Sequence, residues 1–120
     1  MIIDAHVHIS IFDNNASSLQ GAFDLLLEKI QINNVDVAII IPDNIENSSS
    51  IADLDKAIEL IGKYKNLFLL GSPQIIQRGS SEFEKYKNLL ESKKIKGLKF
   101  FPGHDPYYPT DERCLPYYEL

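Results

Sequence analysis

The sequence contains a single cysteine, Cys114, among its 120 residues. One cysteine excludes an internal disulfide framework and is too few for a thiolate metal site. It is also typical of proteins in a reducing compartment. The chain does not open with a cationic segment followed by an apolar stretch, so no secretory signal is expected. Together these features predict a cytoplasmic protein.

Long apolar runs and basic clusters are also missing. The longest apolar run, residues 37–42, is far shorter than the roughly 20 residues that a membrane-spanning helix needs. The chain has 12 basic and 17 acidic residues, and therefore a net charge of −5. This balance argues against nucleic acid or an anionic membrane as a partner. With 44% hydrophobic and 24% charged residues, the composition predicts one compact domain with a core of its own.

Four segments are typical of β-strands. Residues 2–9 form a β-branched run, and residues 35–41 are nearly continuous in apolar side chains. The second run is too short for a typical helix and suits a strand that is buried on both faces. Two further strands are expected at residues 67–70, or as far as residue 76, and at residues 95–101.

Helices are expected between these strands. Ser17 or Ser18 can cap a first helix, whose apolar residues recur at helical spacing over residues 19–30. Ser50 and Asp53 have the spacing of a capping box and predict the start of a second helix. A third capping signal is formed by Ser81 with Glu84, and a final helix is expected from Leu115, with Pro116 in its first turn.

Four βα units predict an α/β fold with parallel strands, because parallel neighbours need a crossover connection. Two architectures fit this pattern, an open doubly wound sheet and a closed (β/α)₈ barrel. The segment from Ser10 to Asp13, after the first strand, contains no Gly-rich phosphate loop. Its absence weakens a nucleotide-binding interpretation.

The motif Asp4-Ala5-His6-Val7-His8 is the main candidate for chemistry. Alternate side chains share one face of a strand, so Asp4, His6 and His8 are expected on the same side. Two imidazoles in that arrangement can reach one cation, and neutral imidazole commonly binds zinc and its neighbours. The alternative is that both histidines are surface or hydrogen-bonded residues, since a bare His-x-His pair is a common pattern. Their position at the end of a first parallel strand favours the metal site.

These residues resemble a known family. Residues 3–8 resemble the strand-one signature of the amidohydrolase superfamily. Residues 97–103 are similar to the fourth-strand segment of its amidohydrolase-related (amidohydrolase 2) branch, and residues 115–120 to the start of the next helix there. The resemblance implies a (β/α) TIM-barrel type of fold with about four βα units present. Residues 1–120 would then be the N-terminal half of a (β/α)₈ barrel, with its C-terminal half missing.

The resemblance also implies a site. His6 and His8 would bind a divalent metal, with zinc as the first expectation, and Asp4 would orient one imidazole. The superfamily's other ligands, a histidine after the fifth strand and an aspartate after the eighth, would lie beyond Leu120. That aspartate is the superfamily's general base, so no catalytic residue can be assigned here, and the isolated chain is expected to be inactive.

Three residues near the fourth predicted strand are candidates for substrate binding. Lys99 lies near the end of that strand and can pair with a substrate carboxylate or an inward-facing acid, or else face solvent as most lysines do. His104 and Asp105 lie on the loop that follows, and loops at this end of parallel strands contact substrates in barrels.

The implied activity is hydrolysis by a metal-activated water, acting on a small carboxylate, lactone or amide, or a related decarboxylation. A PHP-type phosphoesterase is the alternative enzyme, because it also opens on a His-x-His strand. The non-enzymatic alternative is a half-barrel without catalysis, whose exposed edge strands would be covered by self-association into a homo-oligomer.

Overall fold

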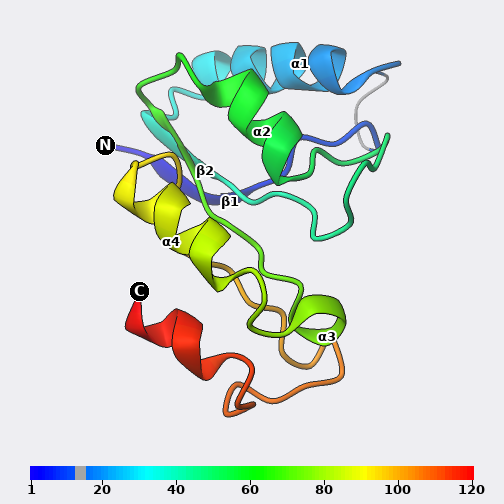
Figure 1. Ribbon diagram of the computed structural model, residues 1–120. Helices are drawn as coiled ribbons and strands as arrows, with labels where there is room; N and C mark the ends of the chain where they lie inside the picture. The colour runs from blue at the N-terminus through cyan, green and yellow to red at the C-terminus, as the bar shows by residue number, and fades with distance from the viewer. Residues whose placement is uncertain (13–15) are drawn as a thin grey trace.

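A three-stranded parallel sheet lies at the centre of the fold. The computed structural model shown in Figure 1 describes residues 1–12 and 16–120, so Asp13 of the first loop lies outside the described residues. The strands are β1 (Ile3–Val7), β2 (Val37–Ile40) and β3 (Leu67–Leu69), in the order β1-β2-β3. Both pairings are parallel, so β2 is the central strand.

Five helical segments accompany the sheet. They are α1 (Leu19–Ile32), α2 (Leu54–Ile61), α3 (Ile75–Arg78), α4 (Phe83–Glu91) and the 3₁₀-helix η1 (Leu115–Glu119). The expected helix at Leu115 is therefore present, with Pro116 in its first turn. No helix in the described part of the chain combines the length and the apolar character that crossing a membrane requires.

The helix starts agree only in part with the capping signals. Ser18, one of the two expected caps, is the N-cap of α1, and its hydroxyl oxygen accepts a hydrogen bond from the Gly21 N–H. The predicted Ser50 cap is wrong, because Asp53 itself is the N-cap of α2 and accepts the Lys56 N–H at 2.9 Å. The capping box of Ser81 with Glu84 is also wrong. The N-cap of α4 is Glu82, whose side chain makes no capping hydrogen bond.

The predicted strands at residues 67–76 and 95–101 are shorter or less regular than expected. β3 ends at Leu69, and residues 75–78 form α3 instead. Residues 95–101 make one isolated parallel bridge, from Leu98 to Gly71. Three backbone hydrogen bonds nevertheless hold this segment beside β3: Lys96 N–H to Leu69 O at 2.8 Å, Gly71 N–H to Gly97 O at 2.9 Å and Lys99 N–H to Gly71 O at 2.7 Å.

The predicted barrel half is wrong. The described residues form a small α/β domain with strands of five, four and three residues, too small and too sparse for half of a (β/α)₈ barrel. The physical reason is that βα alternation predicts parallel pairing but is equally compatible with any parallel α/β sheet. Strand length and closure depend on long-range packing, which the local pattern does not specify.

The core lies on one face of the sheet. Ala38 and Ile40 of β2 are fully buried, whereas the intervening Ile39 is only partly buried. Figure 1 shows α1 and α2 on one side of the sheet, and the core combines their apolar residues with those of β2 and β3. The C-terminal segment joins the same core through Cys114 and Tyr117, which are 0% and 3% exposed. The packed core therefore fixes the positions of the strands and of the loops that follow them.

Candidate functional site

The carboxyl ends of the parallel strands meet at one edge of the sheet. Val7 is the register partner of Ile40, and the Ile41 N–H donates to the Val7 carbonyl at 2.8 Å. The residues that follow, His8 after β1 and Asp43 after β2, thus leave the sheet at the same edge. In open parallel sheets this is the edge at which ligands bind.

The structure brings His6 and His8 together. Their Nε2 atoms are 3.1 Å apart, and their ring centroids are separated by 5.0 Å with an interplanar angle of 58°. Both residues are exposed. With one Nε2 protonated, this contact is an N–H···N hydrogen bond between neutral rings.

The same separation fits two nitrogens that share one metal ion. Zinc–nitrogen bonds are about 2.0–2.1 Å long, which places two ligand nitrogens about 2.9 Å apart at a right angle and about 3.4 Å apart at the tetrahedral angle. The observed 3.1 Å between the two Nε2 atoms lies between these values. Within residues 1–12 and 16–120, no three or more His, Cys, Asp or Glu side chains gather closely enough to hold a metal. His6 and His8 are the two nitrogen donors that the structure brings into contact at this edge.

Local electrostatics favour a neutral His8. Although His8 is exposed overall, partial desolvation of its ring lowers its pKa, and the neighbouring His6 and Lys99 act in the same direction. A backbone hydrogen bond at Ile41 and the charge of Asp43 oppose the shift in that pKa. Neutral imidazole is the form that binds a metal, so the balance suits a ligand.

Asp4 contacts the backbone of the motif. Its carboxylate accepts a hydrogen bond from the His6 N–H at 3.2 Å. The pairing of β1 with β2 shifts register between Asp4 and Val7. The expected contact from Asp4 to an imidazole stays a prediction.

Lys99 and Asp105 lie at the same edge as the histidine pair. The charge of Lys99 acts on His8, and its Nζ is 5.3 Å from the centroid of the Phe101 ring. Asp105 accepts a weak hydrogen bond from the Asn44 side chain at 3.5 Å, which joins the loop after β2 to a loop 61 residues away. His104 is 83% exposed and contacts Asp105 at 3.2 Å. Among the three predicted substrate-binding residues, His104 is thus the one that faces solvent.

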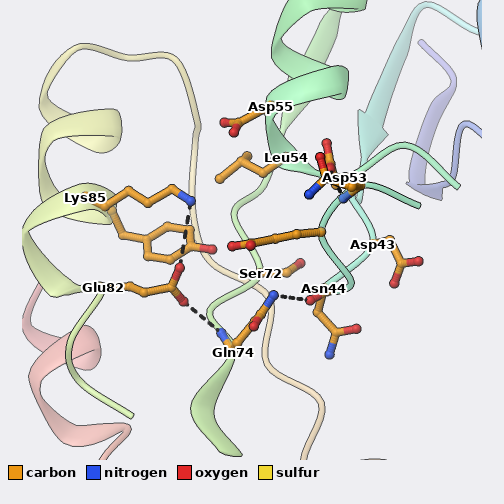
Figure 2. A pocket seen from close by; sticks show the side chains of 12 residues that line it. Asp43, Asn44, Asp53, Leu54, Asp55, Ser72, Gln74, Glu82 and Lys85 are labelled. Carbon is orange, nitrogen blue, oxygen red and sulfur yellow. Dashed lines mark hydrogen bonds and ion pairs between the residues drawn. The ribbon is translucent and has the colours of Figure 1, made fainter. Parts of the chain in front are cut away.

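A polar pocket of about 150 Å³ lies next to this edge (Figure 2). Asp43 and Asn44 after β2, Ser72 and Gln74 after β3, and Glu82 beside α4 contribute to its wall. The Gln74 side chain donates to the Asn44 carbonyl, and the Gln74 N–H donates to Glu82 Oε2 at 3.2 Å. Figure 2 shows this chain of contacts across the floor of the pocket.

Charges in the pocket are partly neutralised. Glu82 is 8% exposed and lies 3.7 Å from Lys85 and 3.9 Å from Arg78. Tyr86, which lines the same pocket, has its pKa raised by burial and by the Glu82 carboxylate. The pocket is therefore a polar compartment with a neutral phenol in its wall.

Sequence reasoning did not single out these pocket residues. The available signal was their position, because Asp43, Asn44 and Ser72 follow apolar strand segments at the ligand-binding edge. Gln74 and Glu82 are brought in by α3 and the start of α4, which no strand pattern predicts.

Comparisons with protein-family models, with curated proteins and with solved structures found no match.

Proposed function

We propose that the chain is a metal-dependent hydrolase of the amidohydrolase type, with His6 and His8 as ligands of one divalent transition metal, zinc first. The observation that carries the proposal is the 3.1 Å separation of the two Nε2 atoms at the carboxyl end of β1. When bound, such a metal supplies Lewis acidity and lowers the pKa of a coordinated water. The proposal rests on this local geometry and on the sequence motif.

The neighbouring residues supply the remaining functions. Lys99 offers a positive charge beside His8, which suits the carboxylate of a small acid or the carbonyl oxygen of a lactone or amide. Asp43 is a carboxylate whose charge reaches His8, and it can accept a proton from water at this edge. Asp105 and Asn44 can hydrogen-bond a polar substrate group. The free, buried thiol of Cys114 supports a cytoplasmic location.

The first test is metal content. Purified protein is loaded with zinc, dialysed and analysed for bound metal, together with the double variant His6→Asn/His8→Asn. We expect about one zinc ion per chain in the parent and none in the double variant, since both nitrogen donors are gone. His104→Asn is the matched control, because it removes an exposed histidine outside the pair. Equal metal content in parent and double variant would refute the site.

The second test is activity. The zinc-loaded protein is assayed on a panel of small lactones, amides and carboxylic esters, with the double variant beside it. The resemblance implied an inactive chain, because the superfamily's general base would lie beyond Leu120. With Asp43 as the proton acceptor, we expect instead that hydrolysis by the parent exceeds that of the double variant, which should match the buffer rate. Lys99→Met should raise KM most for the substrates that carry a carboxylate, because it removes the charge that pairs with them. A parent that binds zinc but hydrolyses nothing on the panel would leave a metal site without this activity and would sink the enzymatic proposal.

A further inference from the structure

A second cleft lies at the opposite, amino-terminal edge of the sheet. Its volume is about 430 Å³, larger than the polar pocket beside the histidine pair. The residues that follow α2 and α4 form its rim, and the first residues of β3 contribute to its floor. It shares no lining residue with the polar pocket of Figure 2.

Four lysines surround this cleft: Lys65, Lys93, Lys94 and Lys96. All four are exposed. Within residues 1–12 and 16–120 none of these four lysines forms a salt bridge, and Lys56 and Lys85, which do, lie elsewhere. A concentration of positive charge on a chain whose net charge is −5 is a local feature that attracts anions.

The floor of the cleft is apolar. Ile61 and Leu67 line it together with the ring of Phe68, which is partly exposed. The Nζ of Lys96 lies 5.8 Å from the centroid of that ring, so a cation stands at the edge of an aromatic surface. A ligand that uses both features needs an anionic group and an apolar body.

The helix-end effect explains only part of this charge. Cations near a helix C-terminus interact favourably with its carbonyl groups, and Lys65 and Lys93 follow α2 and α4. That effect is confined to the last turn of each helix and does not require four lysines to face one cleft.

Lys93 adds an independent observation. It lies just beyond the C-cap of α4 with φ +59°, while the Lys93 N–H donates to Leu90 O and the Lys94 N–H to Leu89 O. This is a Schellman ending, in which glycine or asparagine normally occupies the left-handed position. α1 ends in the same motif with Asn34 at φ +52°. Lys93 therefore adopts a backbone conformation that is unfavourable for lysine, at the rim of the cleft. Backbone strain of this kind is found preferentially at functional sites, so it supports a binding role for Lys93.

We propose that this cleft binds a small organic anion with a flat apolar body, such as an aryl carboxylate, sulfonate or phosphate monoester. The lysines attract the anionic group, and Phe68 with its neighbours receives the apolar body. The site is independent of the metal edge, so a failure of the proposed hydrolase does not affect it.

The probe is 1-anilinonaphthalene-8-sulfonate, an aromatic sulfonate whose fluorescence rises in apolar surroundings. Titration of the parent should give saturable binding, and Lys94→Glu/Lys96→Glu should weaken it by about fivefold to thirtyfold, because two cations are reversed. Lys94→Glu alone should also weaken binding, whereas Lys87→Glu, which makes the same single charge change on α4 outside the cleft, should leave the dissociation constant within about twofold of the parent. Equal weakening by Lys87→Glu would show a general charge effect and refute the site.

Two further measurements separate ligand binding from structure. Lys93→Gly should raise the midpoint of thermal unfolding while it weakens dye binding, because it relieves the left-handed position and removes a charge. If Lys93→Gly bound the dye as tightly as the parent or more tightly, the role given to Lys93 would be overturned. Inorganic phosphate should fail to displace the dye at concentrations where a naphthalene carboxylate displaces it. Equal displacement by phosphate would contradict the apolar half of the proposal.

Discussion

At Gly71, the ring of Tyr86 occupies the space in which any other residue would place its Cβ atom. An added Cβ would lie 2.5 Å from Tyr86 Cε1 and 3.0 Å from Ile95 Cδ1. Tyr86 and Ile95 are both fully buried, so neither can move aside cheaply. Position 71, two residues after the end of β3, is therefore small for a steric reason, and that close approach also lets residues 96–99 run beside the end of β3.

Gly71→Ala should consequently lower the free energy of unfolding by about 1–3 kcal/mol, the usual range for overpacking a core. Urea denaturation measures the change. Gly97→Ala is the matched control on the paired segment, where the nearest atom to an added Cβ, Leu70 Cδ2, is 3.4 Å away. Equal losses in the two variants would show that the Tyr86 contact is not the cause.

Among the helices, α2 depends on a single carboxylate for its start. Asp53 Oδ1 accepts the Lys56 N–H at 2.9 Å, and Oδ2 accepts the Asn47 N–H at 2.7 Å. Asp53→Ala should cost about 1–2 kcal/mol, the upper part of the range for N-caps, because it also releases the preceding loop. Ser50→Ala should change stability little, although the sequence pattern assigns the cap to Ser50. Thermal unfolding followed by circular dichroism distinguishes the two, and the reverse order of effects would contradict this assignment.

The elements that sequence patterns predicted well are those with strong local signals. The apolar run at residues 35–41 contains β2 (Val37–Ile40), and the second helix, expected after Ser50 and Asp53, corresponds to α2 (Leu54–Ile61). The segment after Leu69 was expected to continue as a strand, yet Ile75–Arg78 is helical. The one bridge described for residues 95–101 joins Leu98 to Gly71, beyond the end of β3, and the close contact of Gly71 with Tyr86, which the lack of a Cβ allows, depends on tertiary packing.

The candidate site divides in the same way. The two-residue period of a strand was enough to predict that His6 and His8 lie together. The role expected for Asp4 stays a prediction, because its carboxylate contacts the His6 backbone N–H. The polar pocket was missed because Gln74 and Glu82 reach it through tertiary packing of α3 and α4, which has no periodic signature.

For the whole molecule, the order of the strands sets an order of local stability. β2 has a partner strand on each side. β1 has one partner strand only and is largely exposed, with Ile3 53% exposed. Hydrogen exchange should therefore be slowest at the amides of β2 and measurably faster at those of β1, because an edge strand opens at a lower free energy. Mass spectrometry of exchanged peptides covering Ile3–Val7 and Val37–Ile40 tests this. Equal protection of the two strands would mean that something covers the β1 edge in solution.

The buried thiol of Cys114 is a natural probe for local opening of the C-terminal segment. Its thiol has no exposed surface, and burial raises its pKa, so the reactive thiolate is both shielded and scarce in the folded state. A thiol-specific reagent can therefore reach it only when the segment carrying Cys114 and Tyr117 separates from the core. Since the sequence has no other cysteine, the labelling rate reports that separation alone, without any engineered probe.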